Sequence, residues 1–101
     1  MADEEFAIIS KEQVELKEPS MYNCVLLNDD YTPMDFVVNV LMQIFDKSEN
    51  DANAIMMKVH RVGMCVCGTY TFSIAETKVK QVEMLAEKHG FPLSCVIEED
   101  K

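Results

Sequence analysis

Residues 21–37 read MYNCVLLNDDYTPMDFV, in which an apolar run is followed by a polar turn and then by a change of periodicity. Residues 21–27 are apolar at nearly every position, which predicts a strand covered on both faces. Residues 28–31, Asn-Asp-Asp-Tyr, interrupt the run with side chains that favour turns. The stretch therefore predicts a buried strand that ends in a polar loop.

A helix is predicted to begin directly after this loop. Thr32 is a suitable N-cap, Pro33 suits the first helical position, and Asp35 places an acid in the first turn. The apolar stripe that continues the helix to about residue 46 consists of Val37, Val40, Leu41, Ile44 and Phe45.

The remaining chain repeats these signals. Ser48 predicts the start of a second helix that Gly63 can end. This helix carries the apolar residues Ala52, Ile55, Met56, Val59 and Val62. Residues 64–72 predict a strand, in which Gly68 marks a bulge or a close approach. Residues 73–76, Ser-Ile-Ala-Glu, resemble a capping box for a third helix that ends near Gly90. Residues 93–97 predict a last strand.

These elements predict an α+β fold with a βααββαβ order or a slightly simpler one. Three or four short strands form a small antiparallel sheet, and the helices pack on one of its faces. Residues 1–20 are acidic and weakly periodic, so we expect a flexible N-terminal extension ahead of one core domain at residues 21–101.

Charge and hydropathy limit the ligands and the cellular location that we expect. The formal net charge of −9 opposes binding to a phosphate backbone, so nucleic acid is not the expected ligand. No apolar run reaches the roughly 20 residues that span a bilayer, and the first residues lack the features of a secretory signal. We therefore expect a cytoplasmic protein that does not contact membranes.

The four cysteines, Cys24, Cys65, Cys67 and Cys95, lack the spacing of a zinc site. We expect reduced, mostly buried thiols that pack as small apolar side chains. A redox or metal role is the alternative.

Three features suggest a site. Asn28, Asp29 and Asp30 follow the first strand, and His60 lies near the end of the second helix. Met34, Val37, Met56 and Val59 are apolar side chains close to these helix ends. A strand end and a helix end can bring Asn28, Asp29 and a neutral His60 around one point, as acceptors for a ligand with several N–H donors. Beside them, an apolar cavity would take a bulky side chain.

Each feature also has an ordinary structural interpretation. Asn and Asp are common in turns, His60 suits the negative end of a helix dipole, and the apolar stripe can be core. Catalysis is poorly supported, because no nucleophile with a base and no phosphate-binding loop is visible. Asp29, Asp30 and His60 could bind a metal, although we expect neither a metal nor a cofactor.

The string NDDYTPM at 28–34, with its flanking residues, resembles the signature of the ClpS family of Clp protease adaptors. The similarity continues through Met56, Val59, His60 and Gly63, then Cys67-Gly68, residues 75–79 and Pro92-Leu93. It covers about residues 20–98. Ser73 departs from the acid that many relatives carry there.

The resemblance implies a non-catalytic adaptor that binds destabilising N-terminal residues (Leu, Phe, Tyr, Trp) and delivers the substrate to a AAA+ unfoldase, ClpA or ClpC, through the N-terminal domain of that unfoldase. It implies that Asn28, Asp29 and His60 hold the substrate α-amino group. Met34 would exclude β-branched residues, and the extension at residues 1–20 would engage the unfoldase. The implied side-chain pocket comprises Asp30, Thr32, Met34, Val37, Met56, Val59 and Leu93, and the implied unfoldase surface includes Glu76 and Lys78.

The chemistry of an N-terminus agrees with this interpretation. A free α-amino group is largely protonated at neutral pH, whereas an acetylated one is not basic. Protonation of His60 below about pH 6.5 would oppose the ligand charge and weaken binding. Two rivals remain: a ribosomal stalk-type interaction module, which needs no such cluster, and a metal-assisted hydrolase using Asp29, Asp30 and His60. A monomer is the default expectation.

Overall fold

The computed structural model describes residues 20–101. The predicted extension at residues 1–20 lies outside the described residues except for Ser20. The elements, in chain order, are β1 (Tyr22–Leu27), α2 (Met34–Ile44), α3 (Glu49–Val62), β2 (Met64–Tyr70), α4 (Phe72–His89) and β3 (Ser94–Glu99). The α+β prediction is confirmed, in the simpler version with a single strand between α3 and α4.

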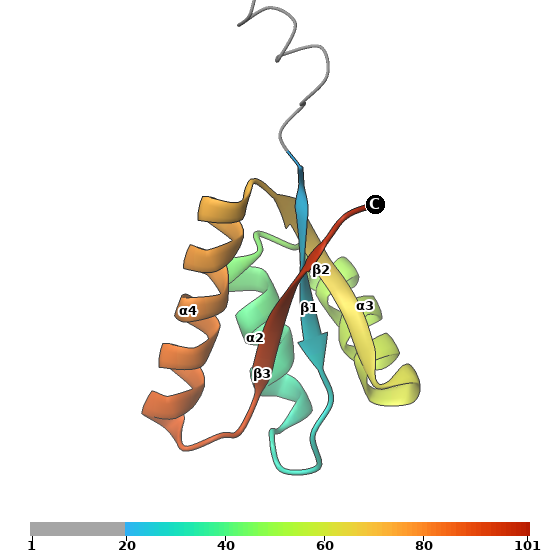
Figure 1. Cartoon of the computed structure of the whole chain (residues 1–101). Helices are drawn as coiled ribbons and strands as arrows, with labels where there is room; N and C mark the ends of the chain where they lie inside the picture. Colours follow the sequence, from blue (N-terminus) through green and yellow to red (C-terminus); the bar gives the residue numbers. More distant parts are fainter. Residues whose placement is uncertain (1–19) are drawn as a thin grey trace, which may run out of the picture.

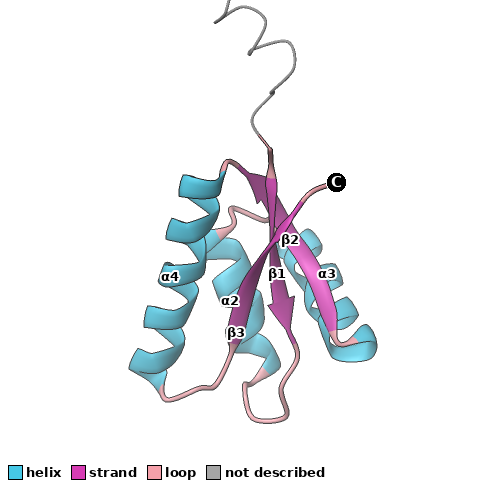
Figure 2. Cartoon of the chain, in the orientation of Figure 1, coloured by secondary structure: helices cyan, strands magenta, loops and turns pink. Residues whose placement is uncertain are grey.

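The described strands form one antiparallel sheet in the order β2-β1-β3, so β1 is the middle strand (Figure 2). Cys24 pairs with Gly68 and Val25 pairs with Val66, which leaves Cys67 as an extra residue on β2. This irregularity confirms the bulge predicted at Gly68. The glycine also permits a close approach, because a Cβ at Gly68 would lie 2.6 Å from Cζ of Tyr70.

The helices cover one face of the sheet (Figure 1). Cys24 and Leu26 of β1 belong to the core beneath them, together with the predicted stripe of α2. Val25 alternates to the other face, where it pairs with Val66 of β2 and Val96 of β3 and is also buried. The middle strand is therefore shielded on both faces, as its composition predicted, but neighbouring strands supply the second cover.

Two predicted helix starts were wrong. The N-cap of α2 is Pro33, whose carbonyl accepts the backbone N–H of Val37, so Thr32 lies one residue outside the helix. The capping box at Ser73 is not formed, because α4 begins at Phe72 after Thr71. At α2 the Thr32 hydroxyl donates to Asp29 instead, and at α4 the earlier start places Ser73 inside the first turn.

The predicted boundaries of α3 are confirmed. The Ser48 side chain accepts the backbone N–H of Asp51 at 3.1 Å, and Gly63 ends the helix with a left-handed φ of 103°. Of the apolar residues on this helix, Ala52 and Val59 are buried in the core and Val62 is exposed. Val62 is the last residue of the helix, directly before Gly63.

The cysteines are reduced, and Cys24, Cys67 and Cys95 are buried while Cys65 is half-buried. Burial raises the pKa of Cys67 to about 12 and also raises the pKa values of Cys24 and Cys95. These three thiols therefore stay protonated and unreactive at neutral pH. This agrees with their predicted role as small apolar side chains.

The domain has two ends that α2 connects (Figure 1). At one end lie the loop after β1, the start of α2 and the end of α3. At the other lie the start of β1, where residues 1–19 attach, the end of α2 and the start of α4. We call these the pocket end and the tail end. None of the helices in residues 20–101 combines the length and apolar character that crossing a bilayer requires.

Candidate functional site

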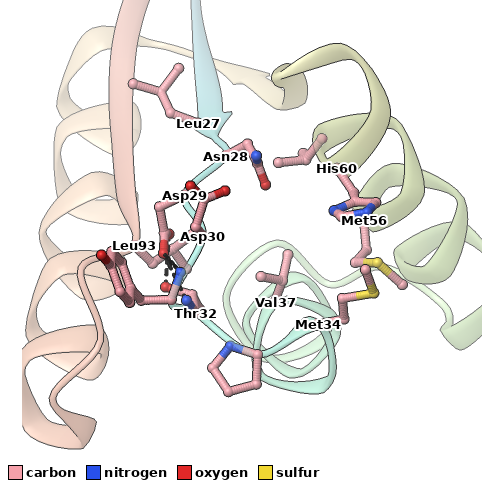
Figure 3. Close-up of a pocket in the computed structure, with 13 residues that line it drawn as sticks. Leu27, Asn28, Asp29, Asp30, Thr32, Met34, Val37, Met56, His60 and Leu93 are labelled. Carbon is pink, nitrogen blue, oxygen red and sulfur yellow. Dashed lines mark hydrogen bonds between the residues drawn. The ribbon is translucent and has the colours of Figure 1, made fainter.

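A pocket of about 320 Å³ opens at the pocket end (Figure 3). Its walls come from the loop after β1, the first turns of α2, the last turns of α3 and the segment before β3. This volume is at the small end of the range for ligand sites, which suits one side chain better than a large cofactor. The lining residues are Leu27, Asn28, Asp29, Asp30, Tyr31, Thr32, Pro33, Met34, Val37, Met56, Val59, His60 and Leu93.

The loop at the pocket mouth is held by Asp29. One carboxylate oxygen accepts the backbone N–H groups of Tyr31 at 2.8 Å and Thr32 at 2.7 Å, and the other accepts the Thr32 hydroxyl at 2.8 Å. Partial burial alone would raise the pKa of Asp29, but these hydrogen bonds outweigh it and lower the pKa below its usual value. Asp29 is therefore a carboxylate at neutral pH and fixes the loop shape.

His60 is brought to the loop by the end of α3. The backbone N–H of Asn28 donates to the carbonyl of Gly63 at 2.9 Å, which joins the end of β1 to the residue that terminates the helix. The exposed His60 side chain lies in the last turn of that helix, and Figure 3 shows it across the opening from Asn28. Residues that are 32 positions apart in the sequence thus share one rim.

The deeper wall is apolar. Val37 of α2, Val59 of α3 and Leu93 before β3 are buried in the core and present side chains to the pocket. Met34 and Met56 complete this wall from α2 and α3, and Met34 is 43% exposed. The pocket therefore joins a rim of oxygen and nitrogen acceptors to an apolar interior.

All ten residues that the sequence assigned to the α-amino cluster and the side-chain pocket line this one pocket. Their individual roles stay predictions. The sequence interpretation missed Leu27, Tyr31 and Pro33. These three adjoin or interrupt the predicted set in the chain, so their neighbours in the sequence were the available signal.

The same rim offers little for metal binding. In the described part of the chain, no three His, Cys, Asp or Glu side chains are grouped as a metal site requires. Both oxygens of Asp29 are already engaged with the loop. The groups that remain suit a ligand that brings its own N–H donors.

The two residues predicted for the unfoldase contact lie on α4, toward the tail end. Glu76 is exposed. Lys78 is half-buried, and its ammonium donates to the carbonyl of Ile44 at 2.6 Å and lies 5.5 Å from the ring centroid of Tyr70. The Lys78 ammonium thus compensates the partial negative charge at the C-terminus of α2. Phe72 and Ile74, each 49% exposed, extend the surface beside them.

Comparison with known proteins gives consistent matches. Residues 17–96 match the family model described as ATP-dependent Clp protease adaptor protein ClpS. The ClpS adapter of Phenylobacterium zucineum is 52% identical over 93% of this chain and 86% of its own length. That of Burkholderia cenocepacia is 54% identical over 91% of this chain and 88% of its own. The structure of Agrobacterium tumefaciens ClpS2 bound to L-phenylalaninamide is similar with a TM-score of 0.80 and 42% identity, covering 82% of this chain and all of that one.

Proposed function

The chain belongs to the ClpS family of ATP-dependent Clp protease adaptor proteins, and we propose that it binds polypeptides whose N-terminal residue is Leu, Phe, Tyr or Trp and delivers them to a Clp unfoldase. The observation that carries the proposal is a single pocket with an acceptor rim and an apolar interior. A ligand with a positive α-amino group beside a bulky apolar side chain matches both parts. The similar Agrobacterium protein was bound to L-phenylalaninamide, a molecule of that kind.

We assign the α-amino group to Asn28, His60 and a carboxylate of the loop. The sequence-based assignment gave Asp29 this role, with Asp30 in the side-chain pocket. The hydrogen bonds of Asp29 to Tyr31 and Thr32 support a different division, in which Asp29 shapes the loop and the exposed Asp30 supplies the charge to the ammonium. Each charge-assisted hydrogen bond should contribute about 1.5–3 kcal/mol.

The N-terminal side chain would occupy the apolar part, against Val37, Met56, Val59 and Leu93. Thr32 stands at its entrance. We propose Met34 as the residue that excludes β-branched side chains, because it is the first residue of α2 and partly exposed at the opening. A side chain branched at Cβ would meet this position before it could enter.

Delivery would use the tail end. We propose that the surface around Glu76 and Lys78, together with exposed Phe72 and Ile74, contacts the N-terminal domain of ClpA or ClpC. Residues 1–20 attach to the same end of the domain and would engage the unfoldase as well. Under this proposal the adaptor performs no catalysis, and ATP hydrolysis and peptide cleavage belong to its partner.

The proposed setting is the bacterial cytoplasm, with the adaptor as a monomer. Four free cysteines support a reducing compartment. No cofactor or nucleic acid is part of the proposal.

Fluorescence anisotropy with labelled peptides tests the pocket. We expect tight binding of free peptides that begin with Phe or Leu. We expect no binding of the N-acetylated peptide, and at least tenfold weaker binding of one that begins with Val. Equal binding of all of them, or of none, would overturn the proposal and leave the stalk-type module as the better hypothesis.

Two variants sharpen this test. His60→Ala should weaken the Phe peptide about tenfold or more by removing one charge-assisted hydrogen bond. His89→Ala is the comparison variant, because His89 is also exposed and lies outside the pocket lining. Its ring packs against Phe36 and Phe91, so the stability of this variant is measured alongside its affinity. Met34→Ala should recover binding of the Val peptide.

A further inference from the structure

Two methionines from different helices form one side of the proposed N-terminus pocket. Met34 begins α2 and Met56 lies in the middle of α3, yet both line the same cavity. Figure 3 shows their thioether sulfur atoms on the same side of it. Met34 is 43% exposed and Met56 is half-buried, so reagents in solvent have access to this wall when no ligand is present.

From this arrangement we propose that Met34 and Met56 are a reversible oxidation site that switches off N-terminus binding. The inference rests on the proposed function. A peroxide supplies the oxygen. A sulfur lone pair attacks the protonated peroxide oxygen, an S–O bond forms and the O–O bond breaks. The proton of the attacked oxygen passes to the leaving oxygen, which departs as water or an alcohol. The sulfur loses two electrons. Methionine sulfoxide reductases restore the thioether with two electrons from a dithiol, and the oxygen leaves as water.

The consequence follows from the rest of the wall. Val37, Val59 and Leu93 face the same space, and none of them offers a hydrogen bond to a sulfoxide oxygen. A sulfoxide oxygen in this wall is hydrogen-bonded to water only while no ligand occupies the pocket. An apolar N-terminal side chain that entered would strip this water from a strongly polar group, and the side-chain N–H groups of Asn28 and His60 that could replace it belong to the rim that the α-amino group would occupy. We expect affinity for a Phe peptide to fall about tenfold or more.

The site should also be protected by its own ligand. A bound side chain fills the cavity and covers Met34, so oxidation at Met34 should slow when a free Phe peptide is present and not when the acetylated peptide is present. Met84, which is 70% exposed on α4 and outside the pocket lining, provides an internal reference. It should oxidise at the same rate under both conditions.

The experiment uses the full chain, partly oxidised with hydrogen peroxide and passed over an immobilised free-N-terminal Phe peptide. Peptide mapping by mass spectrometry then compares the retained and unretained fractions. We expect sulfoxide at Met34 or Met56 to be concentrated in the unretained fraction, and sulfoxide at Met84 to be equally divided. Treatment with methionine sulfoxide reductases A and B should return the unretained protein to the column.

The outcomes separate this inference from the function on which it rests. If the untreated protein is not retained, the proposed function fails. If it is retained and Met34 and Met56 sulfoxides are retained equally well, the oxidation switch is wrong while the function stands. For Met34→Leu/Met56→Leu, the ratio of affinities before and after peroxide should be near one, whereas for Met84→Leu it should match the wild type.

Discussion

The two ends of this domain treat their polar groups in opposite ways. At the tail end, the Lys78 ammonium is committed to the carbonyl of Ile44 and to the ring of Tyr70. At the pocket end, Asp29 is similarly committed to its loop, but Asn28, Asp30 and His60 are left exposed around an apolar opening. At the tail end, Lys78 therefore links α4 to α2 and β2. At the pocket end, several polar side chains are exposed where a ligand could contact them.

This difference predicts which measurement each substitution affects. Changes at the pocket end should act mainly on peptide affinity, and changes to the internal contacts of Lys78 at the tail end mainly on the free energy of unfolding. Asp29 is the exception, because it lies at the pocket end and yet its carboxylate is used internally.

The largest expected effect is that of Asp29→Ala. The substitution leaves the N–H groups of Tyr31 and Thr32 and the Thr32 hydroxyl without their acceptor, so the loop loses its shape. We expect about 100-fold weaker binding of a Phe peptide by anisotropy, against about tenfold for Asp30→Ala. Asp35→Ala, an exposed carboxylate outside the pocket lining, serves as the control. A smaller loss for Asp29 than for Asp30 would contradict this division of roles.

Low pH should disrupt the loop that the Asp29 carboxylate holds. Because the pKa of Asp29 is lowered in the folded protein, its carboxylate stabilises the loop above about pH 4, the usual range of an aspartate, and this stabilisation is lost as the pH falls through the lowered value. By NMR, the amide resonance of Thr32 should be unchanged between pH 7 and 5 and should shift only below about pH 4. A shift centred at or above about pH 4 would show that the hydrogen bonds do not lower the pKa.

At the tail end, Gly68→Ala should have the largest effect. Its Cβ would lie 2.6 Å from Cζ of Tyr70, so the ring must move away from Lys78. We expect the free energy of unfolding in urea to fall by about 1–3 kcal/mol. Peptide affinity should stay within about twofold because the pocket lies at the other end. Adding Tyr70→Leu should recover part of the stability, and a fully additive double variant would argue against this contact.

Lys78→Met tests the ammonium itself. It retains much of the apolar stem but removes the hydrogen bond to Ile44 and the cation–π contact, which together should lower the free energy of unfolding by about 1–2 kcal/mol. Lys80→Met, at an exposed position on the same helix, should change it by less than about 0.5 kcal/mol. Equal effects would mean that Lys78 contributes no more than a surface charge.

The smallest expected effect is an increase in the free energy of unfolding. Asp46 follows α2 with a positive φ of 55°, and the next N–H, from Lys47, donates to the carbonyl of Leu41 at 3.1 Å. Glycine adopts this conformation without a steric penalty, so Asp46→Gly should raise the free energy of unfolding by about 0.5–1 kcal/mol. Asp46→Ala should lower it, and a loss in both variants would show that the Asp46 side chain itself stabilises the turn.

The local elements were largely predictable from the sequence. The apolar stripe of α2, the Ser48 cap, the glycines that end α3 and α4, and the three buried thiols follow from periodicity and from backbone preferences of single residues. Helix starts at Thr32 and Ser73 were misplaced, because several adjacent residues can cap a helix and the choice depends on contacts outside it. Thr32 is an example, since its hydroxyl donates to Asp29 instead.

The membership of the pocket also came from the sequence, through the resemblance carried by residues 28–34 and by Val59-His60. The role of each polar group in the pocket did not come from the sequence. Whether Asp29 or Asp30 is free for a ligand, and whether Lys78 faces a partner or the end of α2, depends on which donors lie within about 3 Å. Periodicity reports which residues share a face of their own element, but hydrogen-bond partners 3 or 34 positions away are chosen only when the loop closes and the helices pack.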